Sequence, residues 1–410
     1  MSLVVQKYGG SSLATPELIK SVAARIRSAH DSEGNVVATV SAMGDSTDKL
    51  LSIASKVSEM PDLRELDVLL STGELQSCAL VAMALKSMGK RAVSLSGAQA
   101  GIRTDSSYGK AKIAGIDTGR INEELEKGNI VIVAGFQGVT GDSDITTLGR
   151  GASDLTAVAL AAGLNADRCE IYTDVEGIYT ADPRLVSDAR KMTQVGFEEM
   201  LELASYGAKM NPRSIELGMV YQVPILVASS FNNEPGTLIH DGENMDTTVG
   251  EIRNRVRGIA TDKDVAKITV FSVVDRPGIA AALFDPLAES DISVDIIVQN
   301  ASVSGTTDLT FTIKQSDLDR AMKVVEEVAR DLGTTNVGKA ENLAKISIVG
   351  TGMQDSPGYA STMFRSLAEA KINIEMITTS EIRITCIIES DQVAKAAEVL
   401  HAAFELEKSD

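Results

Sequence analysis

The sequence contains no tryptophan and very little cysteine or histidine. Its three cysteines and three histidines are Cys78, Cys169, Cys386, His30, His240 and His401. The cysteines are odd in number and far apart, which is typical of free thiols in a reducing cytoplasm and not of a disulfide framework. No histidine lies in a glycine-rich loop, so neither serine–histidine catalysis nor histidine-bound zinc is indicated. We therefore expect no metal held by protein ligands alone.

Positive charge and long apolar runs are also scarce. Lysine and arginine total 39 against 57 aspartates and glutamates, which gives a formal net charge of -18. Nucleic acids are bound mainly through lysine and arginine, so we expect no nucleic-acid partner and only local positive groups for anionic substrates. No run approaches the roughly 20 apolar residues of a membrane span, and the N-terminus lacks the apolar core of a signal peptide. We expect a cytoplasmic protein without a membrane partner.

The pattern along the chain predicts an α/β fold of more than one domain, since 410 residues exceed the usual size of a single domain. Residues 1–235 alternate strand-like runs with helical patterns such as 16–29 and 74–88. The expected strands are 3–7, 36–41, 91–95, 130–135, 169–173 and 224–228. This alternation is typical of a sheet covered by helices on both faces. Pro235-Gly236 breaks it, and the polar stretch 240–255 is expected to be a linker.

Two glycine-rich loops follow apolar strands. Residues 7–12 read KYGGSS, and residues 146–154 read TTLGRGASD. Glycines let backbone N–H groups approach an anion, and Arg150 can bind a carboxylate or phosphate with two parallel hydrogen bonds. Each loop alone is also compatible with a plain turn. Together they favour an enzyme that handles phosphate and a second anionic substrate.

An internal repeat follows the linker. Residues 267–270 lead to Pro277-Gly278, and residues 345–348 lead to Pro357-Gly358, with an offset of 80 from the prolines onward. Each copy predicts a βαββαβ unit of about 70 residues. Paired units of this kind are usually binding modules, although a duplicated structural domain without a ligand is the alternative.

These motifs together resemble the aspartokinase family over essentially the whole chain. KYGGSS, SAMGDSTD at 41–48, STGE at 71–74, GRGASD and YTDVEGIYTADPR at 172–184 are similar to the family's ordered motifs. The resemblance implies a three-layer α/β amino-acid-kinase domain (1–245) and two ferredoxin-like (βαββαβ) ACT domains (262–335 and 340–410). Two departures are Ala152, where a third glycine is usual, and a less typical stretch at 207–213.

The implied reaction is the transfer of a phosphoryl group from ATP, with Mg²⁺, to the side chain of L-aspartate. A carboxylate is already ionised at neutral pH, so the reaction needs positioning and charge screening but no general base. The expected catalytic residues are Lys7, Asp154 and Lys209. The expected aspartate-binding residues are Ser41, Thr47, Glu74, Arg150, Gly151, Ala152 and Ser153.

Arg150 is expected to bind the α-carboxylate of aspartate, and Glu74 its α-ammonium. The alternative for Glu74 is a helix N-terminal carboxylate after Ser71-Thr72-Gly73, where the helix dipole would stabilise it. The expected nucleotide-binding residues are Lys7, Tyr8, Gly9, Gly10, Thr173, Asp174, Tyr179, Asp182, Arg184, Lys209 and Met210. Asp182-Pro183 is also a common turn former, so a plain loop is the alternative there.

Regulation and assembly follow from the repeat and the linker. The resemblance implies inhibition by lysine, threonine or both at Asp275, Gly278, Ile279, Ala280, Gln299 and Asn300. The chain is expected to form a homo-oligomer, or a heterotetramer with a regulatory subunit translated from Met245. The competing functions are another amino-acid kinase acting on glutamate or acetylglutamate, and a non-catalytic amino-acid sensor. The intact set of charged residues speaks against the sensor.

Overall fold

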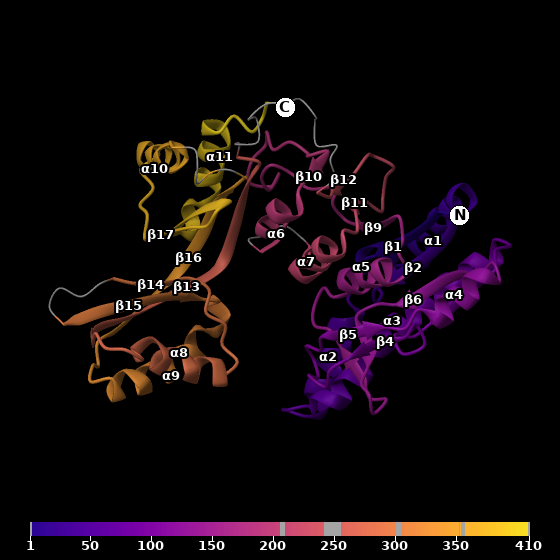
Figure 1. Cartoon of the computed structure of the whole chain (residues 1–410), viewed down its shortest axis with the longest axis horizontal. Helices are drawn as coiled ribbons and strands as arrows, with labels where there is room; N and C mark the ends of the chain where they lie inside the picture. The colour runs from indigo at the N-terminus through magenta and orange to yellow at the C-terminus, as the bar shows by residue number, and fades with distance from the viewer. Residues whose placement is uncertain are drawn as a thin grey trace. The chain divides into compact units, whose positions relative to one another are not determined.

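The structure is a computed structural model that describes residues 2–205, 210–241, 256–300, 305–351, 353 and 357–408 (Figure 1). Two expected features, Lys209 and Met245, lie outside the described residues, as does most of the linker. The chain divides into two compact units. The first contains Met1–Ile178 and Lys191–Val249, and the second contains Tyr179–Arg190 and Gly250–Asp410. The short stretch 179–190 therefore departs from the expected division, which kept it with the kinase domain.

An eight-stranded sheet forms the centre of the first unit. Its order is β10-β12-β11-β9-β1-β2-β6-β3, and β12 runs antiparallel to β11. The strands are β1 (Ser2–Tyr8), β2 (Gly34–Val40), β3 (Ala92–Leu95), β6 (Ile130–Ala134), β9 (Arg168–Thr173), β10 (Gln194–Val195), β11 (Ile225–Ser229) and β12 (Thr237–Ile239). The six expected strands are all present. Val, Ile and Ala fill the central strands, as is usual where both faces of a parallel sheet are covered.

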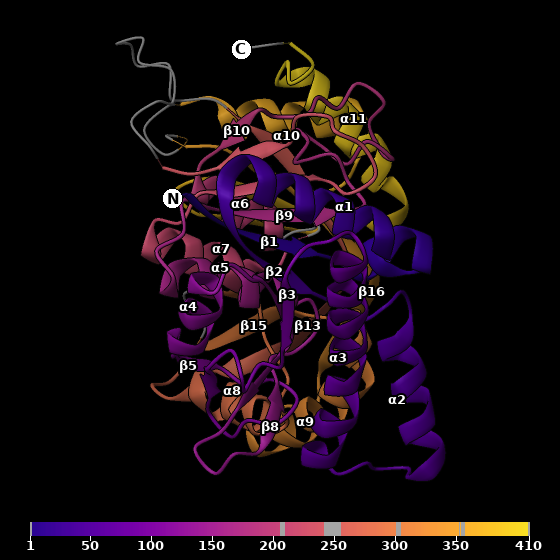
Figure 2. The same ribbon diagram turned by 90° about the vertical axis from the view of Figure 1, so that its right-hand side faces the viewer.

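Helices cover both faces of this sheet (Figure 2). α1 and α3 share one apolar core with β1, β2 and β6, whereas α5 packs on β1, β2 and β9 beside α7. The helices are η1 (Gly10–Leu13), α1 (Pro16–Glu33), α2 (Ser46–Val57), α3 (Leu63–Ser87), α4 (Gly119–Glu126), α5 (Ser153–Gly163), α6 (Phe197–Ser205) and α7 (Pro212–Tyr221). α1 begins where its sequence predicts, because Thr15 Oγ1 accepts the Leu18 N–H and Pro16 occupies the first helical position.

A small second sheet was not expected from the sequence. It has the order β5-β4-β7-β8 and consists of β4 (Ile102–Thr104), β5 (Ile113–Ile116), β7 (Gln137–Val139) and β8 (Ile145–Thr147). Strands of three or four residues are too short to show a clear alternation of apolar and polar residues. This sheet matters for function because β8 leads directly into the GRGASD loop.

The helix α3 begins eleven residues before the expected start at residue 74. Asp62 caps it by accepting the Glu65 N–H. By length and composition alone α3 could cross a membrane, but half of its most apolar window is buried inside the fold. Its buried residues include Asp67 and Glu74, and its apolar side packs in the core of the first unit. α3 is thus a core helix of this unit.

The second unit contains a single six-stranded sheet with the order β14-β15-β13-β16-β18-β17. Its strands are β13 (Gly258–Val274), β14 (Ile297–Gln299), β15 (Thr306–Ile313), β16 (Val337–Val349), β17 (Met376–Thr379) and β18 (Arg383–Glu389). Its helices are α8 (Ile279–Glu289), η2 (Gln315–Asp317), α9 (Leu318–Asp331), α10 (Tyr359–Glu369), η3 (Ser390–Gln392) and α11 (Val393–Ala403). β13 and β16 are long enough to pair with each other and with a strand of their own repeat, so the two repeats share one continuous sheet.

Reciprocal ion pairs join the two repeats. Lys267 of the first repeat lies 2.7 Å from Glu375 of the second, and Lys345 of the second repeat pairs with Asp295 of the first. Asp295 and Glu375 hold the same place in their repeats, at the offset of 80 seen in the sequence. A lysine of each repeat therefore forms an ion pair with a carboxylate of the other repeat.

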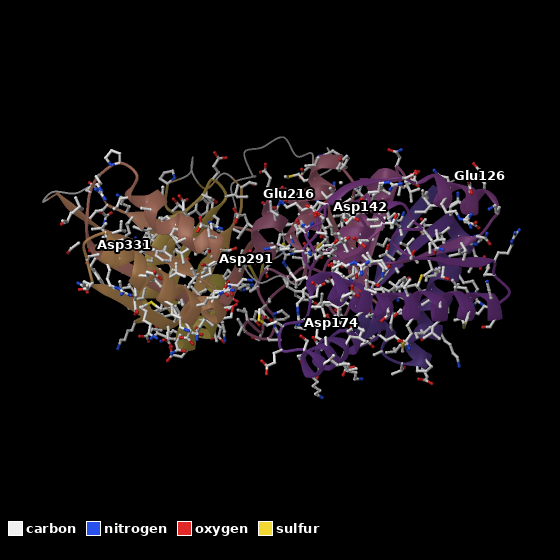
Figure 3. The ribbon with its side chains drawn as sticks, turned by 90° about the horizontal axis from the view of Figure 1, so that it is seen from below. Glu126, Asp142, Asp174, Glu216, Asp291 and Asp331 are labelled. Carbon is white, nitrogen blue, oxygen red and sulfur yellow. The ribbon has the colours of Figure 1, made fainter. Side chains whose placement is uncertain are left out.

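The acidic balance of the chain appears on its surface. The side chains labelled in Figure 3, which are Glu126, Asp142, Asp174, Glu216, Asp291 and Asp331, are all exposed. They come from both units. Both units therefore carry acidic side chains on their surfaces.

Candidate active site

The loops 7–12 and 41–48 and the segment after Thr173 leave the large sheet at the carboxyl ends of the parallel strands β1, β2 and β9, whereas the GRGASD loop follows β8 of the small sheet. Tyr8 at the end of β1 lies in register with Val40 of β2 and with Tyr172 of β9. The chain passes from β1 to β2 on one side and reaches β9 later on the other, so the order of the sheet reverses beside β1. Ligands of open α/β sheets bind outside the carboxyl ends of the strands at such a point.

Lys7 and Asp154 form a buried ion pair at this edge. Lys7 Nζ lies 2.6 Å from Asp154 Oδ1, and their side chains are 11% and 10% exposed. Asp154 lies in the first turn of α5, where the helix dipole favours a negative charge. α5 can approach the sheet because residue 135 is glycine: a Cβ there would lie 2.9 Å from both Ser153 and Thr39. The sequence predicted this partnership, and the contact is present.

Close backbone contact joins the loop after β1 to the loop after β2. The Gly44 N–H donates to the carbonyl oxygen of Gly10, and a Cβ at Gly10 would lie 2.8 Å from the carbonyl oxygen of Ala42. Glycine is therefore required at position 10 by packing. The Gly9 N–H donates to the carbonyl oxygen of Tyr172 at 3.3 Å, and its contact with a phosphate stays a prediction.

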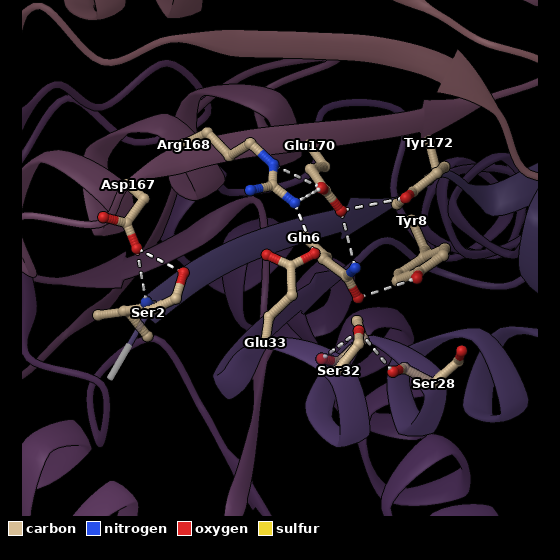
Figure 4. Close-up of polar contacts among 12 residues, drawn as sticks. Ser2, Gln6, Tyr8, Ser28, Ser32, Glu33, Asp167, Arg168, Glu170 and Tyr172 are labelled. Carbon is tan, nitrogen blue, oxygen red and sulfur yellow. Dashed lines mark hydrogen bonds and ion pairs between the residues drawn. The ribbon is translucent and has the colours of Figure 1, made fainter.

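Tyr8 supports the strand and does not present its side chain to a ligand. Its ring is fully buried, stacks on Tyr172 at 5.1 Å between ring centroids, and donates its hydroxyl to Gln6. Figure 4 shows the surrounding network, in which Gln6 and Tyr172 both donate to Glu170. Arg168 Nε donates to the same carboxylate. Burial raises the pKa of both tyrosines, so they stay neutral.

Glu74 is a buried carboxylate beside the loop 41–48. Its Oε1 accepts the Ala42 N–H at 3.1 Å, whereas Oε2 has no hydrogen-bond partner among the described residues. Burial raises the pKa of Glu74 to about 7. A buried carboxylate oxygen without a partner is costly unless a cationic group binds it. These properties fit the predicted contact with an ammonium group.

The alternative assigned to Glu74, a carboxylate at a helix N-terminus, is wrong. Glu74 lies in the middle of α3, which spans Leu63–Ser87. Ser71 and Thr72 donate their hydroxyls back to main-chain oxygens of the same helix and do not cap it. Gly73 is glycine for another reason, since its Cβ would lie 2.9 Å from the Cβ of Ala42. The STGE motif marks a close contact between α3 and the loop 41–48.

Arg150 is the exposed member of the site. Its side chain is 81% exposed and donates to Asp48 Oδ1 at 3.2 Å. Asp48 belongs to the SAMGDSTD motif, as do the expected Ser41 and Thr47, which are both half-buried. The loop 41–48 thus contacts Arg150 through Asp48 and Glu74 through Ala42. The sequence gave Asp48 no role.

Ala152 replaces a glycine without strain. Gly149 and Gly151 have φ values of 91° and 72°, which favour glycine, but Ala152 has φ −80°. Its methyl group is fully buried against Leu148 and Leu155. The departure from the family pattern therefore adds packing under the loop and leaves its backbone in an ordinary conformation.

Two polar side chains that the sequence did not single out, the buried Asp67 and the half-buried Arg213, hold this loop. Asp67 of α3 accepts the N–H and hydroxyl of Thr147 and the N–H of Gly109. Arg213 of α7 donates to the carbonyl oxygens of Leu148 and Ala111. Both reach across from elements distant in sequence, and no local pattern reveals such contacts.

The expected nucleotide-binding residues are divided between the units. Thr173 ends β9 in the first unit and Asp174 follows it, and the Ser230 N–H donates to the carbonyl oxygen of Thr173. Met210 is buried in the same unit. Tyr179, Asp182 and Arg184 belong to the second unit, where Arg184 Nη2 lies 2.6 Å from Asp182 Oδ2.

The expected effector residues lie around the first Pro-Gly loop and the end of β14. Gly278 has φ 91° and precedes α8, and the Asp275 N–H donates to the carbonyl oxygen of Gly305. Ile279 is buried in the core below, so only its main chain faces the loop. Asn300 lines an open cavity of about 430 Å³ on the sheet, together with Lys267 and Glu375.

Comparison with known proteins decides the family. The model of the amino acid kinase family matches residues 2–229, and the ACT domain model matches residues 268–328 and 346–404. The aspartokinase of Corynebacterium glutamicum is 49% identical over 414 residues, which cover 100% of this chain and 98% of that protein. The chain belongs to the aspartokinase family. It is therefore an enzyme, an aspartate kinase, as the sequence motifs predicted.

Other relatives agree with this assignment to the aspartokinases. The aspartokinase 2 of Bacillus subtilis is 46% identical over 100% of this chain and 99% of its own. Aspartokinase III of E. coli in complex with aspartate and ADP has a TM-score of 0.81 at 25% identity, covering 98% of this chain and 100% of that one. The Clostridium acetobutylicum aspartate kinase has a TM-score of 0.77 at 26% identity, with the same coverage. The predicted fold class is confirmed.

Proposed function

We propose that the chain transfers the γ-phosphoryl group of ATP to the side-chain carboxylate of L-aspartate, which gives 4-phospho-L-aspartate and ADP. The observation that carries this assignment is the buried Lys7–Asp154 pair at the carboxyl edge of the sheet, beside two glycine-rich loops. The E. coli relative in complex with aspartate and ADP supports both substrates.

Catalysis would depend on positioning and charge. The aspartate carboxylate is ionised at neutral pH and attacks phosphorus directly, so no side chain need remove a proton. Lys7 would screen the charge of the transferring group, and Asp154 would hold its ammonium in place at 2.6 Å. Lys209, which lies outside the described residues, would be the second phosphate-binding lysine.

Aspartate would be recognised by opposite charges at its two ends. Arg150 is exposed and can exchange its Asp48 partner for the α-carboxylate of aspartate. Glu74 offers its unpartnered Oε2 to the α-ammonium. Hydrogen bonds from Ser41, Thr47 and the turn Gly151, Ala152 and Ser153 would complete the site.

Magnesium would be held chiefly by phosphate oxygens and water, as is usual for this ion. Among the described residues, no group of three His, Cys, Asp or Glu side chains is arranged to hold a metal. Asp154, the acidic side chain nearest the proposed phosphate site, is already paired with Lys7. The ion would supply further screening of the phosphate charge.

The test is a comparison of acceptors. ADP release from ATP and Mg²⁺ is measured with L-aspartate, L-glutamate and N-acetyl-L-glutamate. The acyl phosphate is trapped with hydroxylamine, and the resulting hydroxamate is identified by mass spectrometry. We expect a hydroxamate only with aspartate. Activity on glutamate but not aspartate would refute the assignment in favour of another amino-acid kinase. No activity with any acceptor would favour a non-catalytic amino-acid sensor.

We further propose that the reaction is the first step toward lysine, threonine and methionine, and that lysine, threonine or both inhibit it. The Clostridium relative is described as an allosteric enzyme. The exposed Asp275, Gly278, Gln299 and Asn300 and the main chain of Ile279 and Ala280 would bind the effector. Indifference of the purified enzyme to both amino acids at millimolar concentrations would refute this regulation.

A further inference from the structure

A short segment of the chain that lies between two parts of the first unit packs in the core of the second unit. Residues 179–190 belong to that unit, although Ile178 and Lys191 on either side belong to the first. Ala181 and Val186 are 3% and 4% exposed and share an apolar cluster with Leu400 of α11. The segment is therefore held by the ACT repeats, and it contains Tyr179, Asp182 and Arg184.

Thr180 fixes the segment through all of its polar atoms. It is 1% exposed, its N–H donates to the carbonyl oxygen of Arg190, and its own carbonyl oxygen accepts the Ile259 N–H of β13 at 2.7 Å. Its hydroxyl accepts the Arg190 N–H at 2.9 Å and lies 2.9 Å from His401 Nε2. The contacts with Arg190 and Ile259 use only main-chain groups of these neighbours. The contact with His401 depends on a side chain of α11.

His401 lies in the last turn of α11 and is 2% exposed. Burial lowers its pKa, so the ring is neutral near pH 7. The nearest acid, Glu407, lies 4.0 Å from Nδ1, beyond hydrogen-bond distance. The neutral ring accepts the Thr180 proton at Nε2 when its own proton is on Nδ1. A buried hydrogen bond of this kind fixes a segment in direction as well as in position.

We propose, on the basis of the nucleotide-binding role given above to Tyr179, Asp182 and Arg184, that His401 is a positioning residue for ATP. By holding Thr180, it fixes the turn that begins next to Tyr179. Asp182 then shapes that turn by accepting the Arg184 N–H and pairing with the Arg184 guanidinium. When the anchor is lost, the binding-competent form is less populated, and the apparent affinity for nucleotide falls by the same fraction.

A merely structural role makes a different prediction. If the Thr180–His401 contact only stabilises the second unit, its loss lowers the melting temperature and leaves nucleotide affinity unchanged. The pair Ser347 and Thr385 provides a matched control, because their hydroxyls share a buried hydrogen bond of 2.7 Å in the same unit and neither residue belongs to the segment 179–190.

The experiment compares the full-length variants Thr180→Val, Thr180→Ser, His401→Leu and Thr385→Val with wild type. The dissociation constant of ADP is measured by calorimetry, KM for ATP and for aspartate by ADP release, and Tm by scanning fluorimetry. We expect Thr180→Val and His401→Leu to weaken the binding of ADP and to raise KM for ATP by roughly five- to tenfold, the scale of one buried hydrogen bond. KM for aspartate should change less than about twofold. Thr180→Ser keeps the hydroxyl and should remain near wild type.

Three results would overturn the proposal. The first is a lower Tm in Thr180→Val and His401→Leu with unchanged ADP affinity, as expected of Thr385→Val. The second is an equal loss in Thr180→Ser and Thr180→Val, since the hydroxyl would then not matter. The third is a parallel rise in KM for ATP and aspartate. Failure of the proposed function is distinguishable, because wild type would then not phosphorylate aspartate, whatever the ratio of ADP affinities between variants.

Discussion

At the scale of single residues, the buried carboxylate of Glu74 lowers the stability of the folded chain when it is ionised. Its carboxylate is buried, and only one of its two oxygens has a hydrogen-bond partner among the described residues. The folded chain therefore favours the protonated form, with a pKa of about 7 against an ordinary value of 4.5. Bound ammonium would reverse this preference.

This arrangement predicts the pH dependence of substrate binding. Below about pH 7 Glu74 of the free enzyme is protonated and cannot pair with an ammonium. KM for aspartate should therefore rise as pH falls from 8 to 6, approaching tenfold per unit at the acid end. Glu74→Gln should have a high KM that is flat over this range. A wild-type KM that is constant from pH 6 to 8 would contradict the assigned role.

The same carboxylate predicts a stability profile. Because its pKa is raised on folding, ionisation lowers the free energy of unfolding as pH rises from 4.5 toward 7, by about 3 kcal/mol in full. Glu74→Gln should thus become more stable relative to wild type over this interval. Urea unfolding at several pH values measures the difference in the free energy of unfolding. The exposed Glu126→Gln serves as control and should show no such trend. A parallel profile for both variants would disprove the effect.

Lys7 and Arg150 should have different kinetic signatures. Lys7 is buried beside Asp154 and is proposed to act on charge that grows in the transition state, so Lys7→Ala should lower kcat by roughly a hundredfold or more. Arg150 is exposed and is proposed to bind the α-carboxylate of aspartate in the ground state, so Arg150→Ala should chiefly raise KM for aspartate. Steady-state kinetics with both substrates would decide. Identical signatures would show that the division of roles is wrong.

Residue types in short motifs predicted part of this site. Lys7 and Asp154 could be paired from sequence because both lie in glycine-rich motifs. The burial of Tyr8 could not be predicted, since its ring stacks against Tyr172 of β9, a strand that is distant in sequence. Asp67 and Arg213 were missed for the same reason, because their partners lie across the fold.

At the scale of helices and strands, the reciprocal ion pairs make the two repeats one body. Lys267→Glu should lower the free energy of unfolding by about 1 kcal/mol or more, and adding Glu375→Lys should restore part of the loss. The matched control is Lys339→Glu with Glu341→Lys, a pair on β16 that is 45% and 43% exposed. Chemical unfolding of the four single and two double variants measures the coupling. Equal coupling in both pairs would contradict a special role for Lys267 and Glu375.

Elements were predictable where the pattern is long. The central strands and α1 appear as expected because apolar runs and caps are local signals. The small sheet β5-β4-β7-β8 and the early start of α3 were not foreseen. Likewise, each repeat was read as a unit by itself, whereas β13 and β16 are shared by both. Pairing between distant segments leaves no periodic trace in the sequence.

At the scale of the whole molecule, we propose that copies of the chain assemble through the second unit. β14 and β17 are the edge strands of its sheet, and each carries an exposed isoleucine: Ile297 is 51% and Ile377 45% exposed. Exposed apolar edges are a usual site of strand addition by another chain. A subunit translated from Met245, outside the described residues, would carry both edges and could replace one full-length copy.

Two measurements test this assembly. Ile297→Lys and Ile377→Lys should shift the sedimentation of the purified chain toward the monomer, because a lysine at a strand edge opposes pairing. Val57→Lys, at a position in α2 that is 84% exposed, should leave it unchanged. Expression of the native gene with intact-mass analysis should reveal a fragment beginning at Met245 that disappears when this codon is changed to leucine. If the fragment is absent, or persists after recoding, the oligomer contains full-length chains alone. If all three lysine variants sediment as wild type, the edges of this sheet do not hold the copies together.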